Sequence, residues 1–125
     1  MSSRLVKTSI AFLGGCQMAE ALIGGLVASQ AAAPDSICAT DPVAARRDLL
    51  TSRFGIRVGE ENREAVRQAD LVVLAVKPQA MPAVLSEIGS ALGGKLIVSI
   101  AAGVTVAWIR ERVTQPRGIV RAMPN

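Results

Sequence analysis

Length, composition and charge limit the kinds of protein that this chain can be. Its 125 residues suffice for one domain with a buried core; half of them are hydrophobic and only 2% are aromatic. The basic residues behind the net charge of +4 are scattered and have no aromatic side chains between them, which makes nucleic acid an unexpected partner.

The number of cysteines and the hydropathy of the chain indicate the cellular compartment to expect. Two cysteines and no histidine are too few for a disulfide framework or a metal site. The residues before Ser9 are short and polar, unlike a signal peptide, and no apolar run reaches the roughly 18 residues of a membrane-spanning helix. We therefore expect a cytoplasmic protein with no membrane partner.

Short apolar segments alternate with helical patterns along the chain, which predicts an α/β fold with a mostly parallel, doubly wound sheet of about six strands. Residues 71–76 are apolar throughout, as expected of a strand covered on both faces. Asp41-Pro42 is expected to cap one helix, and Asn62 is expected to cap another. In chain order we expect strand 9–13, a helix carrying Met18 to Val27, strand 37–40, helix 43–53, strand 56–58, a brief helix to residue 68, strand 71–76, helix 79–92, strand 95–100, helix 104–113 and strand 118–121.

The first strand and helix meet in residues 10–19, Ile-Ala-Phe-Leu-Gly-Gly-Cys-Gln-Met-Ala. A strand that ends in glycines and leads straight into a helix is typical of Rossmann-type dinucleotide-binding domains, where N–H groups at the helix start hold a pyrophosphate. In the pattern G-x-G-x-x-G/A, Gly14 takes the first place and Ala19 the last, but Cys16 replaces the second glycine.

Cys16 has three interpretations. Its side chain can crowd the phosphates and weaken binding, or the turn can be slightly wider so that the small thiol points aside. A reactive thiolate is the third, because a helix N-terminus lowers the pKa of a cysteine. Cys38, within an apolar strand, is interpreted as part of the core.

Asp41 ends the second predicted strand, about 20 residues beyond the glycine turn. A carboxylate there can accept hydrogen bonds from the ribose hydroxyls of NAD and repels the 2′-phosphate of NADP, or it can simply cap the next helix. Arg46 and Arg47 are near enough in sequence to meet a 2′-phosphate, although such arginines more often form a solvated helix face. Asp41 thus predicts a weak preference for NADH, whereas an NADPH preference would point to Thr40, Arg46 or Arg47.

The remaining strand ends are rich in Gly, Ala, Pro and Asn, which suits backbone contacts to a flat cofactor. Lys77 could meet phosphate or carboxylate, or only mark the exit of a strand into solvent. The lone Trp108 is interpreted as packing. Since the chain has no histidine and no tyrosine, the usual proton donors of a reductase are missing, and no residue is assigned a catalytic role.

Four segments at these strand ends resemble, in order, the motifs of the pyrroline-5-carboxylate reductase family. They are Phe12-Leu-Gly-Gly-Cys-Gln-Met-Ala19, Leu74-Ala-Val-Lys-Pro-Gln79, Val98-Ser-Ile-Ala-Ala-Gly-Val104 and Arg121-Ala-Met-Pro-Asn125. The middle two are far more specific than the glycine pattern. The resemblance implies an oxidoreductase of proline biosynthesis, which moves a hydride from NADPH or NADH to the C=N carbon of 1-pyrroline-5-carboxylate, a cyclic imine acid, to give L-proline.

The resemblance also implies a role for each matching residue. The phosphate loop would comprise Gly14, Gly15, Cys16, Gln17 and Met18. Asp41 would meet the adenosine ribose or its 2′-phosphate, and Asn62 would contact the cofactor near the adenosine. The ribose and nicotinamide would be lined by Ala75, Val76, Lys77 and Pro78 and by Ala101, Ala102 and Gly103. Family members usually have glycine where Cys16 stands, and Gln17 is an acceptable variant of the more frequent asparagine.

Family members continue after Met-Pro-Asn with Thr-Pro and a helical C-terminal domain, which forms the dimer and completes the substrate site. By this resemblance, residues 1–125 are the cofactor-binding domain, the helical domain is absent, and the full-length enzyme is a homo-oligomer through it. We expect the chain alone to be inactive. Two alternatives stay open: a degenerate, non-catalytic nucleotide-binding module, or the cofactor domain of another imine or hydroxyacid reductase.

Overall fold

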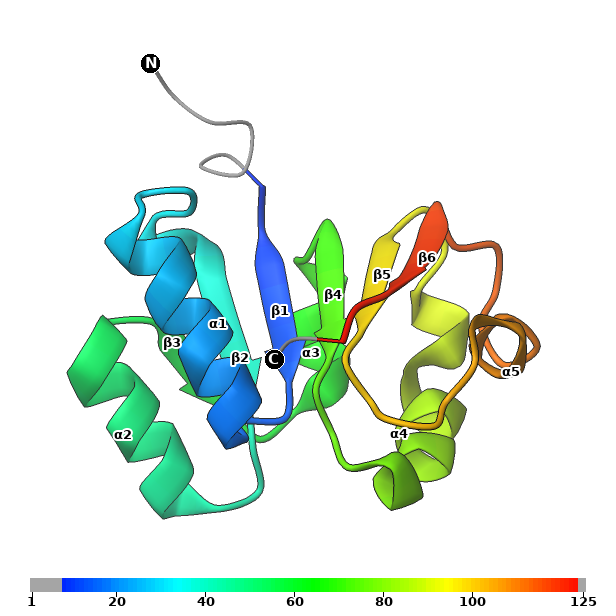
Figure 1. Ribbon diagram of the computed structural model, residues 1–125, viewed down its shortest axis with the longest axis horizontal. Helices are drawn as coiled ribbons and strands as arrows, with labels where there is room; N and C mark the ends of the chain where they lie inside the picture. Colours follow the sequence, from blue (N-terminus) through cyan, green and yellow to red (C-terminus); the bar gives the residue numbers. More distant parts are fainter. Residues whose placement is uncertain (1–7, 124–125) are drawn as a thin grey trace.

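The computed structural model describes residues 8–123, which form one six-stranded parallel sheet with helices on both faces (Figure 1). Across the sheet the order is β3-β2-β1-β4-β5-β6, which is that of a doubly wound fold and confirms the prediction. The expectation of no signal peptide and the final Pro-Asn of the fourth motif concern residues outside the described part. The strands are β1 (Ile10–Leu13), β2 (Ile37–Thr40), β3 (Arg57–Gly59), β4 (Leu71–Leu74), β5 (Leu96–Ser99) and β6 (Gly118–Arg121).

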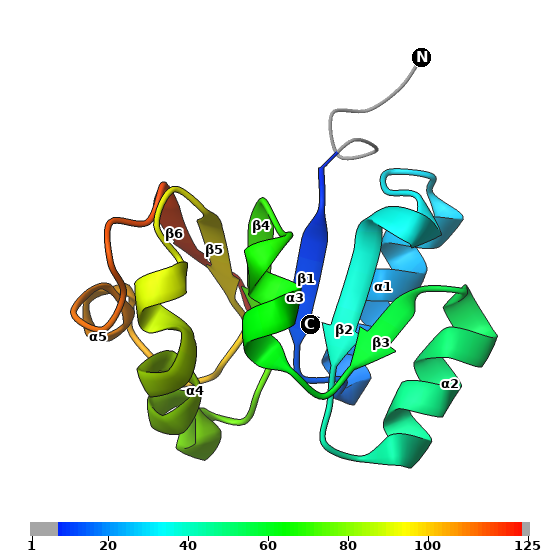
Figure 2. The same ribbon diagram turned by 180° about the vertical axis from the view of Figure 1, so that it is seen from behind.

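Helices of the described residues cover both faces of the sheet (Figures 1 and 2). α1 (Gln17–Ala28) and α2 (Ala44–Phe54) cover the half formed by β1, β2 and β3. α3 (Asn62–Arg67), α4 (Met81–Ile88) and α5 (Val106–Arg110) lie on the opposite face. The helices change face because the chain winds first to one edge of the sheet and then returns past β1 to the other.

The central strand β4 contributes to two separate hydrophobic cores. Val72 and Leu74 belong to the core beneath α3, α4 and α5, whereas Val73 and Ala75 belong to the core beneath α1 and α2. Successive side chains of a strand point to opposite faces, so a strand between two cores needs an apolar residue at every position. The apolar run at residues 71–76 is thereby explained.

Two helices are shorter than their sequence patterns indicated, and the segments that follow both of them meet at Gly89. The Gly89 carbonyl oxygen accepts a hydrogen bond from the Thr114 N–H at 3.0 Å, and a Cβ at this position would overlap the carbonyl oxygen of Arg112. This close approach of two segments replaces the last turns of both helices. The predicted helix 79–92 becomes a 3₁₀ turn at Pro78–Ala80, then α4, then a 3₁₀ turn at Gly89–Ala91, and α5 ends at Arg110.

The two predicted helix caps are also wrong by one or two positions. Val43, not Asp41, is the N-cap of α2, and Pro42 lies before the helix. The Asp41 carboxylate instead accepts hydrogen bonds in the turn and in the neighbouring loop. Asn62 is the first residue of α3, with Glu61 as N-cap, and its side chain bonds to groups outside its own helix.

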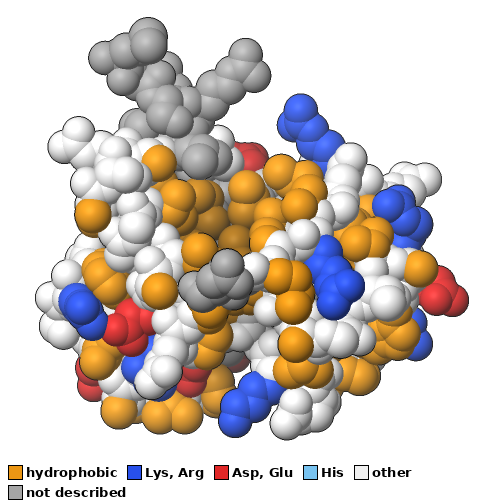
Figure 3. All heavy atoms as spheres, viewed as in Figure 1, with side chains coloured by type: hydrophobic (Ala, Val, Ile, Leu, Met, Phe, Trp, Pro, Cys, Tyr) orange, Lys and Arg blue, Asp and Glu red, His pale blue; other side chains and the backbone are white. Residues whose placement is uncertain are grey.

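On the α1 face, no helix among the described residues lies over β4, β5 and β6 (Figure 1). Figure 3 shows hydrophobic side chains gathered around a hollow on this face. The hollow has a volume of about 370 Å³ and is lined by Phe12, Ala21, Leu22, Gly25, Leu26, Val73, Val98, Ile100 and Ala122. This half of the sheet is therefore covered on one face only by the described residues.

Candidate dinucleotide-binding site

The candidate site lies at the edge of the sheet where the carboxyl ends of β1, β2, β3 and β4 meet. The strand order reverses between β1 and β4, and doubly wound sheets bind their ligands at such a reversal. A cavity of about 400 Å³ opens there, lined by Gly14, Thr40, Asp41, Pro42, Glu60, Asn62, Val76, Ala80 and Val84. Four predicted site residues are among them, one from each segment that follows these strands.

Gly14 begins the turn after β1 in a backbone conformation that requires glycine. Its φ is +102°, and a Cβ would lie 2.7 Å from the carbonyl oxygen of Ala75 at the end of β4. Its N–H donates to the carbonyl oxygen of Thr40 at 2.9 Å, at the end of β2. Gly14 thus holds the turn between the two strands that flank β1.

Gly15 is tied to Asp41 by a hydrogen bond from its N–H to Asp41 Oδ2 at 2.9 Å. The other carboxylate oxygen, Oδ1, accepts from the Val43 N–H at 2.8 Å. Asp41 therefore fixes the phosphate loop relative to the turn after β2. Since each carboxylate oxygen has a further lone pair, Asp41 can still accept a hydrogen bond from a ribose hydroxyl.

Cys16 is the N-cap of α1. Its φ is −69°, so the backbone there does not require glycine. Its Sγ accepts a hydrogen bond from the Ala19 N–H at 3.4 Å, which turns the thiol back onto the first turn of the helix. This geometry corresponds to the interpretation in which the thiol points aside.

The start of α1 leaves two main-chain donors free. The N–H groups of Gln17 and Met18 have no hydrogen-bond partner among residues 8–123. Free N–H groups at the positive end of a 12-residue helix form an anion-binding site. The phosphate loop predicted from the sequence therefore has the donors that a pyrophosphate requires.

Asn62 is held in one orientation by two hydrogen bonds. Thr40 Oγ1 donates to Asn62 Oδ1 at 2.5 Å, and Asn62 Nδ2 donates to Glu87 Oε1 at 3.1 Å. The contacts join β2, α3 and α4 at one side of the cavity. They place the amide beside Asp41 in the same cavity.

The residues predicted to line the nicotinamide form a more open region. Ala75 and Ala101 are buried at the ends of β4 and β5, and only Val76 lines the cavity. Lys77 is exposed, and its side chain has no partner among the described residues, so this side chain marks the exit of the strand into solvent. Pro78, Ala102 and Gly103 are exposed at the same edge, and Gly103 has a φ of +76°.

Arg46 and Arg47, two of the three arginines of α2, do not form a solvated face. Arg46 donates from Nε to the Gly15 carbonyl oxygen at 2.7 Å and pairs with Glu20 at 2.8 Å. Arg47 donates from Nη1 to the Asp41 carbonyl oxygen at 2.8 Å and pairs with Glu60 at 3.0 Å. Both guanidinium groups are therefore engaged within the chain, around the phosphate loop and the turn after β2.

Five cavity residues were not among the predicted site residues, namely Thr40, Pro42, Glu60, Ala80 and Val84, although Thr40 was named as a residue to which an NADPH preference would point. Thr40 and Glu60 could have been found from the sequence, because they belong to the turns at the ends of β2 and β3. Val84 was expected on the inward face of its helix, and Ala80 lies four residues earlier, on the same side. Nothing in the sequence says that this side meets the phosphate loop.

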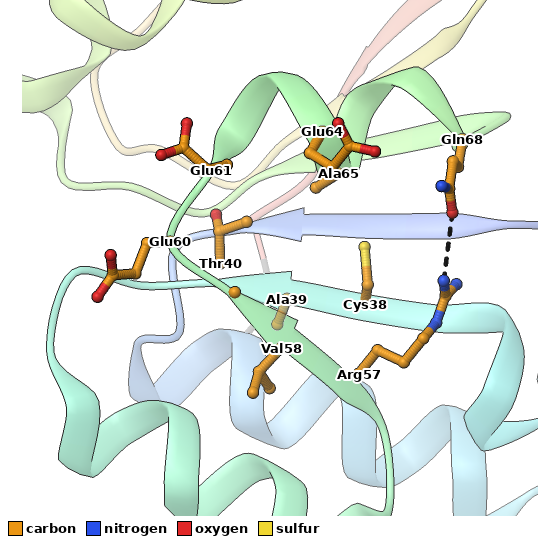
Figure 4. Close-up of a pocket in the computed structure, with 11 residues that line it drawn as sticks. Cys38, Ala39, Thr40, Arg57, Val58, Glu60, Glu61, Glu64, Ala65 and Gln68 are labelled. Atoms are coloured by element: carbon orange, nitrogen blue, oxygen red, sulfur yellow. Dashed lines mark hydrogen bonds between the residues drawn. The ribbon is translucent and has the colours of Figure 1, made fainter.

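A second hollow, of about 330 Å³, lies beside β2 and β3 on the α3 face (Figure 4). Cys38 lies there, half-buried and packed against the core; burial raises the pKa of its thiol, and the charge of Arg57 partly opposes this. Arg57 Nη1 donates to Gln68 Oε1 at 3.2 Å across the hollow. Within residues 8–123 no group of three or more histidine, cysteine, aspartate or glutamate side chains is placed to hold a metal ion.

Comparisons with known proteins agree with the geometry. Among curated proteins, the pyrroline-5-carboxylate reductase of Pseudomonas aeruginosa is 50% identical over 117 residues, which is 93% of this chain and 42% of that protein. The solved pyrroline-5-carboxylate reductase of Coxiella burnetii has a TM-score of 0.87 and 36% identity, covering 94% of this chain and 44% of that one. That of Plasmodium falciparum, with NADP bound, has a TM-score of 0.84 and 27% identity, covering 97% and 44%.

These alignments confirm the resemblance read from the four motifs, and the chain spans less than half the length of the relatives. None of the helices in the described part is long and apolar enough to cross a membrane. Residues 9–103 match a family sequence model described as NADP oxidoreductase, coenzyme F420-dependent. Because that match covers most of the chain, the protein belongs to this oxidoreductase family.

Proposed function

We propose that this chain is the NAD(P)H-binding domain of a pyrroline-5-carboxylate reductase, which reduces 1-pyrroline-5-carboxylate to L-proline. The observation that carries the proposal is the turn after β1. Gly14 adopts a conformation open to glycine, Gly15 is tied to Asp41, and the start of α1 offers free N–H groups. The 50% identity to the Pseudomonas aeruginosa reductase supports the choice of reaction.

In this proposal, the residues at the carboxyl edge of the sheet bind different parts of the coenzyme. Gln17 and Met18 donate their N–H groups to the pyrophosphate, and Asp41 accepts from the adenosine ribose. Asn62, held by Thr40, contacts the adenosine side. Small residues after β4 and β5, among them Ala75 and Ala101, leave room for the nicotinamide ring, which supplies a hydride to the C=N carbon of the substrate.

Proton donation and recognition of the cyclic imine acid are assigned in this proposal to a helical domain outside the chain. The chain contains no histidine or tyrosine, and the curated relatives are more than twice as long. The same domain would join subunits into a homo-oligomer. The cytoplasmic location, and the expectation that neither nucleic acid nor membrane is a partner, stay predictions.

Cys16 favours a second candidate function, a degenerate nucleotide-binding module without catalysis. The thiol points aside, but its Sγ already occupies the N–H of Ala19, which would otherwise be a further donor to the phosphates. The two functions differ in whether the chain binds a nicotinamide coenzyme.

Titration of the chain with NADH and with NADPH, followed by nicotinamide fluorescence, separates the candidates. The reductase domain predicts saturable binding of at least one coenzyme, with NADH modestly favoured because Asp41 lines the cavity. No saturable binding of either coenzyme would favour the degenerate module. In a parallel assay with 1-pyrroline-5-carboxylate, detectable proline formation by the purified chain would contradict the proposed need for a further domain.

A further inference from the structure

Glu60 lines the candidate cavity but has no role in the proposed binding of the coenzyme. It lies on the loop that leads from β3 into α3 (Figure 4) and lines the cavity together with Asp41. Its Oε1 lies 3.0 Å from Arg47 Nη2, in an ion pair between two different connections of the sheet. The side chain of Arg47 is only 18% exposed, whereas that of Glu60 is 65% exposed.

The charge beside the adenosine ribose decides between the two nicotinamide coenzymes. An acidic group at the end of the second strand favours a 2′-hydroxyl, whereas a free arginine nearby accommodates a 2′-phosphate. Arg47 is close in sequence to Asp41. It also contacts the turn after β2, because its Nη1 donates a hydrogen bond to the Asp41 carbonyl oxygen. The Arg47 guanidinium also forms an ion pair with Glu60, and the Arg46 guanidinium forms an ion pair with Glu20.

We propose that Glu60 is a positioning residue for coenzyme choice: it holds Arg47 against the turn after β2 and thereby sets a preference for the coenzyme without a 2′-phosphate. The inference rests on the proposed function, because it needs a nicotinamide dinucleotide in this cavity. Asp41 contributes the acidic group beside the ribose, and Glu60 withholds the arginine that could oppose it.

Because Glu60 is exposed, its ion pair with Arg47 can be removed or screened without disturbing the core. The carboxylate of this ion pair is exposed, and Arg47 keeps its hydrogen bond to the Asp41 carbonyl oxygen, so the loss of the pair should leave the fold intact. The freed guanidinium would then have Nη2 available for a phosphate while Nη1 stays bonded to the Asp41 carbonyl oxygen. Higher ionic strength screens exposed charges and should weaken the preference in the native chain.

The test compares Glu60→Gln with Glu61→Gln, a matched control. Glu61 is the next residue and carries the same charge, but it does not line this cavity, and no bond to Arg47 is found for it. Affinities for NADH and NADPH are measured by fluorescence titration. We expect the ratio of the NADPH Kd to the NADH Kd to fall about fivefold to tenfold in Glu60→Gln, because a charge-assisted hydrogen bond to phosphate becomes available. Glu61→Gln should leave the ratio unchanged.

A second set of variants asks whether Glu60 acts through Arg47. Glu60→Asp keeps the acid and should retain the native preference. Arg47→Met is combined with Glu60→Gln, and the gain in NADPH affinity should vanish in the double variant. A gain that survives without Arg47 would overturn the positioning role, since it would reflect the loss of negative charge alone. An unchanged ratio in Glu60→Gln, in a chain that binds both coenzymes, would overturn the inference but not the proposed function. Failure of the native chain to bind either coenzyme would overturn both.

Discussion

The two ends of the candidate site differ in how completely this chain builds them. At the end formed by β1, β2 and β3, polar groups from separate segments hold one another: Gly15 with Asp41, and Thr40 with Asn62. These contacts fix the positions of the main chain and of the amide before any ligand arrives. This is the adenosine end of the proposed function, and residues that all belong to the chain preorganise it.

At the end formed by β4 and β5, the same edge offers small or exposed residues. Ala75 and Ala101 are buried, while Lys77 and Ala102 reach solvent and have no side-chain partner within the described range. Under the proposed function, we expect binding energy to come chiefly from the adenosine end, and we expect the nicotinamide end to be completed by groups outside the chain. Substitutions at the first end should therefore change coenzyme affinity far more than substitutions at the second.

The largest effect is expected from Gly14→Ala. Alanine is strained at a φ of +102°, and its Cβ would lie 2.7 Å from the Ala75 carbonyl oxygen. We expect the free energy of unfolding to fall by about 2 kcal/mol and coenzyme binding to be lost, because the turn must shift. Chemical denaturation and fluorescence titration measure the two effects.

Gly25→Ala is the matched control for Gly14→Ala. Gly25 lies within α1, without a positive φ, and a Cβ there meets nothing within 4 Å. Alanine should stabilise the helix by about 0.5 kcal/mol and leave affinity unchanged. Equal affinity of Gly14→Ala and the native chain would show that the turn does not hold the coenzyme.

Asp41→Asn comes next in size. The asparagine amide offers one acceptor in place of two, so either the Gly15 or the Val43 N–H loses its partner. We expect affinity for NADH to fall about tenfold and affinity for NADPH to fall less, because the negative charge beside the ribose is removed as well. Asp48→Asn removes the same charge from an exposed position on α2 and should change neither affinity. A parallel loss for both coenzymes would mean that Asp41 positions the loop without discriminating between them.

Cys16→Gly should have a smaller effect, in the opposite direction. It removes the thiol from the phosphate loop and frees the Ala19 N–H, while glycine is acceptable as an N-cap. We expect coenzyme affinity to rise about threefold, which corresponds to about 0.6 kcal/mol. Cys16→Ser retains a capping side chain and separates the two causes: it should stabilise α1 without the full gain in affinity. No change in Cys16→Gly would show that the thiol does not crowd the phosphates.

The contrast between the two ends also marks what the sequence could predict. The alternation of apolar strands and helical patterns was sufficient for the doubly wound fold, because β4 needs an apolar residue at each position and the glycine turn has a recognisable spacing. These signals are local, or repeat along one segment. Helix ends were less predictable, since α5 stops where Gly89 meets Arg112, a contact between segments distant in sequence.

The partners of charged residues were the least predictable part of the site. Arg46 and Arg47 are adjacent in the sequence, yet Arg46 forms an ion pair with Glu20 and Arg47 forms one with Glu60. Both glutamates lie outside α2. A residue count cannot supply such pairings, because they depend on how α1, α2 and the loop after β3 pack. The coenzyme preference that we propose for these charges would therefore be a property of the folded chain.

The smallest effect is expected at the open end, from Lys77→Ala. The side chain of Lys77 is exposed and has no partner among residues 8–123, although the resemblance of its motif implies a position beside the nicotinamide. Coenzyme affinity should change by less than about twofold, since an isolated surface substitution is worth within about 0.5 kcal/mol. Lys95→Ala is the contrasting lysine: its Nζ donates to the Ala69 carbonyl oxygen at 2.6 Å, so its loss should lower stability by up to about 1 kcal/mol without changing affinity. A tenfold loss of affinity in Lys77→Ala would mean that the chain already builds the reacting end, and the distinction between a preorganised adenosine end and an open nicotinamide end would fail.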